Sequence, residues 1–141
     1  MPEPTAAPDP ALRARLESAA GGLVYTSESD RPFEWFFLPG GAAGWPYGVD
    51  EFARRLGAAP GEKREERSLE HFLARHIETS DPYDVEAQRI RPRYEDLRRV
   101  LEASLGEVRV FRLGTMEVRC YAVGSDGRGN LAGLRTIAIE T

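Results

Sequence analysis

The chain has 141 residues, of which 41% are hydrophobic and 30% are charged, and this composition is typical of one globular domain. Its net charge of −4 argues against a nucleic-acid or anionic-membrane binder and suits a basic partner. The single cysteine, Cys120, excludes an internal disulfide framework, and we expect it to be a small buried apolar residue.

Residues 1–8 are rich in proline and alanine, so we expect a disordered tail there, followed by a single domain over residues 9–141. The tail has neither a basic segment nor an apolar core and does not resemble a signal peptide. No apolar stretch approaches the ~20 residues that span a bilayer. The sequence therefore predicts a cytoplasmic protein without a membrane partner.

Helical patterns dominate the first two thirds of the chain. Asp9 is a typical N-cap before Pro10, and apolar residues recur at helical spacing until the glycine pair 21–22. Three further helices are predicted from Val49 to Gly57, after Ser68 as far as Ile77, and from Val85 to Ser104. Pro92 should either kink the last helix or mark its true start.

Strand patterns lie between and after these helices. Residues 26–32 are predicted as a turn-rich loop. Residues 33–38 are apolar on both alternating faces, so we expect a strand covered on both sides, with Phe33, Trp35 and Phe37 in the core. The charged residues 62–67 indicate either a loop or an edge strand. Three strands follow at residues 108–113, 116–123 and 131–140.

Early helices followed by an antiparallel meander define an α+β fold. Because the strands carry apolar residues on both faces, we predict a three-layer α/β/α sandwich around a mainly antiparallel sheet.

Two sequence blocks carry a more specific signal. The first runs from Gly22 to Leu38 and reads GLVYTSESDRPFEWFFL; the second runs from Gly129 to Thr141 and reads GNLAGLRTIAIET. With the VFRLG segment at residues 110–114, they resemble the nuclease A inhibitor family. The resemblance covers most of the chain, from about Leu12 to Thr141, and is weakest over residues 39–80.

This resemblance implies a sandwich similar to the pathogenesis-related-1-like fold. It also implies a one-to-one protein inhibitor of a sugar-non-specific DNA/RNA endonuclease of the ββα-metal type. In the family, the C-terminal threonine reaches the partner's metal, and the glutamate of a Ser-Glu-Ser segment meets its active-site arginine. Those positions are Thr141 and Glu28 here. Tyr83 matches a family contact in the loop before the long helix, where Pro82 replaces the family's tryptophan.

Physical chemistry supports these expected partner contacts. A nuclease active site built for phosphate holds positive charge and Mg²⁺, which accepts oxygen ligands. Thr141 supplies a hydroxyl and an α-carboxylate at the end of a predicted strand, and Glu140 adds a second carboxylate. Glu28 suits a bidentate pair with a guanidinium, and Ser27 and Ser29 can orient its loop. Such carboxylates mimic a phosphate without offering a bond to cut.

Other interpretations of the same residues stay open. Glu28 can instead cap its own loop or pair with Arg31. His71 and His76 are five positions apart, about 140° around a helix, which does not suit a pair of metal ligands. The arginines of residues 85–104 alternate with acidic residues, which indicates a solvated helix face and not a nucleic-acid surface.

No catalytic motif is present, so we expect neither an enzyme nor a cofactor or metal of the chain's own. The alternatives to an inhibitor are an interaction module of the same fold that binds another basic protein, or a small hydrolase. Deleting Thr141 or extending the chain beyond it should weaken inhibition.

Overall fold

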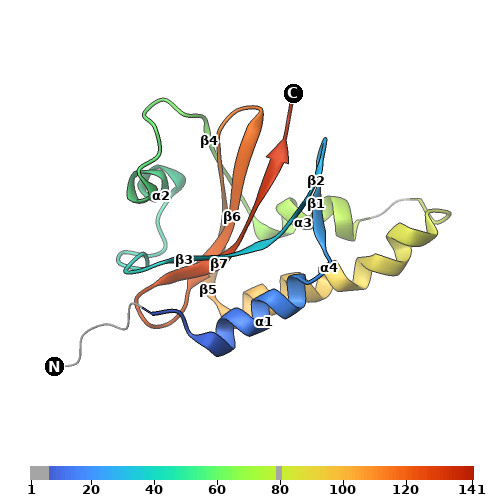
Figure 1. The fold of residues 1–141 in the computed structure, drawn as a ribbon, viewed down its shortest axis with the longest axis horizontal. Helices are drawn as coiled ribbons and strands as arrows, with labels where there is room; N and C mark the ends of the chain where they lie inside the picture. Colours follow the sequence, from blue (N-terminus) through green and yellow to red (C-terminus); the bar gives the residue numbers. More distant parts are fainter. Residues whose placement is uncertain (1–6, 79–80) are drawn as a thin grey trace.

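The computed structural model describes residues 7–78 and 81–141, so most of the tail predicted over residues 1–8 lies outside the described part. Within these residues the protein is an α+β fold (Figure 1). Its helices are α1 (Pro10–Ala20), α2 (Val49–Leu56), α3 (Leu69–Ile77) and α4 (Val85–Ser104). Among the described residues, none of these helices is both long and apolar enough to cross a membrane.

Local side-chain chemistry explains where the helices begin and end. The carboxylate of Asp9 accepts the N–H of Ala11 at 3.0 Å, and the hydroxyl of Ser68 accepts the N–H of His71 at 3.0 Å. Gly57 ends α2 in the left-handed conformation, with φ of 72°. These boundaries confirm the helix predictions. Pro92 lies inside α4 and does not mark its start.

A five-stranded antiparallel sheet has the strand order β3-β7-β6-β5-β4. Its strands are β3 (Glu34–Leu38), β4 (Arg64–Arg67), β5 (Gly106–Leu113), β6 (Glu117–Ser125) and β7 (Leu131–Ile139). The charged segment at residues 62–67 thus contributes an edge strand, one of its two predicted forms. The last three strands confirm the predicted meander, with limits shifted by at most two residues.

A separate hairpin corrects the prediction of a loop over residues 26–32. The short strands β1 (Val24–Thr26) and β2 (Asp30–Pro32) pair antiparallel, with only residues 27–29 between them. Strands of three residues are too short to show an alternating pattern, which is why the sequence indicated only turn residues. This hairpin positions Glu28 at its turn.

Helices cover both faces of the sheet. Figure 1 shows α2 on one side and α1, α3 and α4 on the other. The larger apolar core joins these three helices to one face of the sheet, and a second core joins α2 to the other face around the fully buried Phe52 and Phe111. The sheet is therefore the middle layer of three. The expected similarity to the pathogenesis-related-1-like fold stays a prediction.

The aromatic strand β3 is packed on both faces, but it lies at an edge of the sheet. Phe33, Trp35 and Phe37 are consequently half-buried against the larger core, and only Phe36 is buried. The prediction of three core aromatics is thus correct only in part. Cys120 is buried as expected, and burial raises the pKa of its thiol to about 11.

Candidate functional site

Three segments meet at the end of the sheet where β7 finishes (Figure 1). They are the hairpin turn at residues 27–29, the turn between β5 and β6 at residues 114–116, and residues 140–141 after β7; we call them together the tip. The N–H of Glu28 donates to the carbonyl of Ile139 at 3.3 Å, and the N–H of Glu140 donates to the carbonyl of Met116 at 2.7 Å. Main-chain hydrogen bonds therefore fasten both turns to the end of β7.

The tip brings together Glu28 and Thr141, which the family resemblance singled out. The Glu28 carboxylate accepts the main-chain N–H of Thr141 at 2.5 Å. It also accepts the Thr141 hydroxyl, whose oxygen lies 2.7 and 2.9 Å from the two carboxylate oxygens. The alternative pairing of Glu28 with Arg31 is absent from the interactions of the described residues.

Hydrogen bonds from Thr141 hold the pKa of Glu28 below its ordinary value, and the bond from the hydroxyl contributes more than the bond from the N–H. Both residues are exposed to solvent. The pair is therefore an ionised carboxylate that is oriented by its neighbour and open to a partner.

Glu140 is anchored by a different cation. The guanidinium of Arg112, on β5, donates to a carboxylate oxygen of Glu140. The Arg112 side chain is only 11% exposed, whereas that of Glu140 is 47% exposed, so the arginine holds the carboxylate from the protein side and leaves it accessible to solvent. The tip thus presents two side-chain carboxylates, each held by a defined donor.

The two serines beside Glu28 differ in what they do. The Ser27 hydroxyl accepts the N–H of Ile139 at 2.9 Å and donates to the carbonyl of Ser29 at 3.2 Å. The Ser29 hydroxyl is buried and finds no hydrogen-bond partner among the described residues. Both serines were predicted to orient the loop of Glu28, and among the described residues only the Ser27 side chain makes hydrogen bonds that could do so.

An open hollow of about 600 Å³ lies beside the tip. Four basic side chains line it: Arg67, His71, Arg75 and Arg112. The guanidinium of Arg75 donates to the carbonyl of Thr26 at 2.7 Å, which ties α3 to the hairpin. The exposed carboxylates of the tip thus lie beside a hollow that is lined by basic side chains.

His76 also supports the hairpin, which sequence reasoning did not predict. Its Nε2 accepts the N–H of Thr26 at 3.2 Å, and its ring stacks on Tyr94 with centroids 4.2 Å apart. Burial, reinforced by the charge of Arg75, lowers the pKa of His76 to about 4. Among the described residues, no cluster of three or more His, Cys, Asp or Glu side chains suits a metal ion.

The structure does not bring Tyr83 to the tip. Tyr83 is 89% exposed in the loop before α4, where its N–H donates to the carboxylate of Asp81 at 2.9 Å. It is not among the described residues that line the hollow beside Glu28. Any contact made by Tyr83 would therefore be separate from those of the tip.

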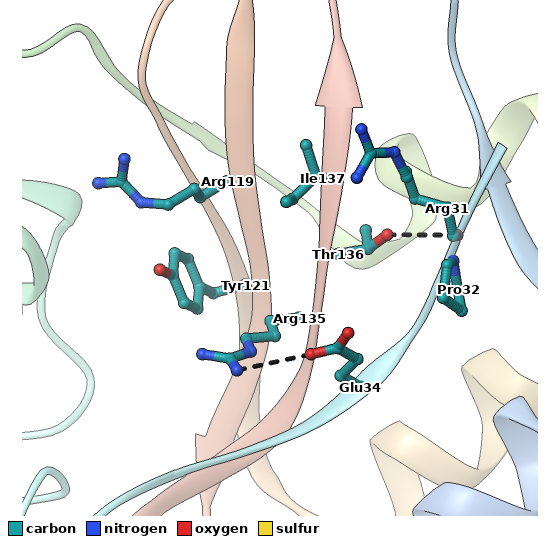
Figure 2. Close-up of a pocket in the computed structure, with 8 residues that line it drawn as sticks. All are labelled: Arg31, Pro32, Glu34, Arg119, Tyr121, Arg135, Thr136 and Ile137. Atoms are coloured by element: carbon teal, nitrogen blue, oxygen red, sulfur yellow. Dashed lines mark hydrogen bonds and ion pairs between the residues drawn. The ribbon is translucent and has the colours of Figure 1, made fainter. Parts of the chain in front are cut away.

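A smaller hollow of about 180 Å³ lies between β7 and β2 (Figure 2). Three arginines surround it: Arg31, Arg119 and Arg135. Arg119 forms an ion pair with Glu62 at 2.6 Å, and Arg135 forms one with Glu34 at 3.5 Å. In Figure 2 the three guanidinium groups lie apart from one another, with Tyr121 and Ile137 between them, so they form no single cradle for a small anion.

The fold and the tip define a small three-layer α+β domain that presents oriented carboxylates at one end. The chain matches the family model described as "Nuclease A inhibitor-like protein" over residues 10–141. It therefore belongs to the nuclease A inhibitor-like family, which confirms the resemblance seen in its two sequence blocks. No curated protein matches the chain.

Proposed function

We propose that this protein inhibits a Mg²⁺-dependent, sugar-non-specific endonuclease of the ββα-metal type by inserting the tip into its active site, one inhibitor to one nuclease. The observation that carries the proposal is the exposed Glu28 carboxylate, which Thr141 holds in one orientation through its N–H and its hydroxyl. Membership of the nuclease A inhibitor-like family supports it.

Glu28 is the group that meets the nuclease's active-site arginine. A guanidinium and a carboxylate form two parallel hydrogen bonds when both are rigidly presented. The hydrogen bonds from Thr141, which lower the pKa of Glu28, also hold its carboxylate in one orientation. Opposite charge on the two surfaces also speeds their encounter.

Thr141 and Glu140 supply oxygen atoms for the partner's Mg²⁺. The Thr141 hydroxyl donates its one hydrogen to Glu28, so its lone pairs are available to bind a cation or to accept a hydrogen bond from a metal-bound water. The Arg112 guanidinium holds Glu140 beside it. Mg²⁺ prefers such hard oxygen ligands and keeps several of its waters.

The remaining predicted contacts have lesser parts in this proposal. Ser27 and Ser29 shape the turn that carries Glu28, and Tyr83 makes a peripheral contact away from the tip. The chain needs no catalytic residue, cofactor or metal of its own, and it binds neither nucleic acid nor membrane directly. The setting we propose is the cytoplasm.

The test is a titration of the untagged protein into a Mg²⁺-dependent, sugar-non-specific nuclease from the same genome, with DNA cleavage as the readout. We expect stoichiometric loss of cleavage. Glu28→Gln and Thr141→Val should each weaken inhibition by about 10- to 100-fold. The first removes the charge that pairs with the guanidinium, and the second removes the hydroxyl that orients Glu28 and offers an oxygen atom to the metal. Glu17→Gln removes an exposed, ion-paired carboxylate on α1 and serves as the matched control.

Unchanged inhibition by both tip variants would refute the plug mechanism. A stable complex without loss of cleavage would favour an interaction module with another role. If the pure protein cleaved a phosphodiester, and substitution of a residue that lines the hollow beside the tip abolished that cleavage, the result would favour a hydrolase.

A further inference from the structure

The turn between β5 and β6 holds a methionine in an unfavourable conformation. Met116 has φ of +65°, a left-handed value that residues other than glycine and asparagine seldom adopt. Its side chain is nevertheless 60% exposed, one of the largest exposed apolar surfaces among the described residues. Both features oppose stability, since the backbone is strained and the apolar side chain faces water.

The hydrogen bonds of this turn use only the main chain of Met116. Its carbonyl accepts the N–H of Glu140 at 2.7 Å, and the carbonyl of Thr115 accepts the N–H of Glu117 at 2.7 Å. Glycine or asparagine would make the same main-chain bonds with less strain. The apolar side chain at this position is therefore unexplained by the turn itself.

The position of Met116 relates it to the tip. Glu117 on β6 pairs with Ile139 on β7, which places Met116 across from Glu140, one residue from Thr141. The strained, exposed methionine thus borders the same surface as the carboxylates, and Figure 1 shows the β5–β6 turn at the same end of the molecule as the end of β7.

We infer that Met116 is an apolar contact of the tip, packing into an apolar depression beside the basic site that receives Glu28, Glu140 and Thr141. This inference rests on the proposed function. A methionine side chain is unbranched and polarizable, so it fits irregular apolar surfaces and the edges of aromatic rings. Packed beside charged contacts, it excludes water and strengthens them.

The test compares Met116→Gly with Glu107→Gly in the same nuclease titration. Glu107 is the other described non-glycine residue with positive φ, 54°, and lies at the opposite end of β5. Glycine relieves the backbone strain in both variants, so both should melt at or above the wild-type temperature. Inhibition should weaken by about 10-fold or more only in Met116→Gly, because only that variant loses an interface side chain.

Two further variants separate shape from polarity. Met116→Leu keeps the apolar volume and should retain most of the inhibition, whereas Met116→Gln keeps the length but adds an amide that must be desolvated, and should weaken it. Inhibition by Met116→Gly and Met116→Gln equal to that of the wild type would overturn the inference. Such an outcome would refute only the role of Met116, provided that the wild type inhibits and that Glu28→Gln inhibits less well. If wild type fails to inhibit, both proposals fall.

Discussion

Acidification should loosen the hairpin that carries Glu28, because His76 folds in its neutral form. Its Nε2 is an acceptor for the N–H of Thr26, at 3.2 Å, and its ring lies against Tyr94. A proton on Nε2 would remove this acceptor and place a second cation beside Arg75. The negative charge of Asp30 favours the protonated ring, but it does not outweigh burial and Arg75. The pKa of His76 is accordingly lowered from 6.5 to about 4.

The sign and size of the effect follow from proton linkage. Below pH 6.5 the unfolded chain binds a proton at His76 while the folded chain does not, so stability that is complete above pH 6.5 is lost as the pH falls toward 4. Full linkage between these two pKa values would amount to about 3 kcal/mol. Because the ring is only half-buried, solvent screening reduces our expectation to about 1–2 kcal/mol.

The assay is urea unfolding between pH 7.5 and 4.5, above the range in which most carboxylates take up protons. His76→Gln keeps an acceptor near Nε2 and does not titrate, so its stability should depend less on pH than that of the wild type. His71→Gln changes the exposed histidine of the same helix and serves as the control. Equal pH dependence in the wild type and His76→Gln would refute the reasoning.

Two further predictions concern the sheet. A Cβ on Gly133 would lie 1.9 Å from the carbonyl oxygen of Ala122, so Gly133→Ala should lower the unfolding free energy by at least about 3 kcal/mol. Gly48 has open space around it, so the control Gly48→Ala should lower the unfolding free energy by under about 1 kcal/mol in the same urea titration. Arg112→Met keeps the buried volume but removes the guanidinium that holds Glu140. Inhibition should therefore weaken by about 5- to 10-fold in the cleavage assay, while the unfolding free energy changes by less than about 1 kcal/mol. Inhibition equal to that of the wild type would contradict this role for Arg112.

Much of the fold could be predicted from the sequence, because the information lies close along the chain. The N-caps Asp9 and Ser68 and the glycine after α2 act on main-chain groups within four residues of themselves. Periodicity placed the four helices and the last three strands for the same reason: it reports which face of each element is buried. The two sequence blocks that resemble the family likewise indicated Glu28 and Thr141 as site residues, a role that stays a prediction.

Only the tertiary structure decided how these residues meet. Glu28 and Thr141 are 113 positions apart, and His76 and Thr26 are 50 apart. No spacing rule connects such pairs, since their contact depends on the hairpin lying across the end of β7 and on the register that sets Met116 opposite Glu140. The sequence by itself determined the elements through short-range backbone chemistry, whereas the geometry of the tip arose from long-range packing and strand pairing.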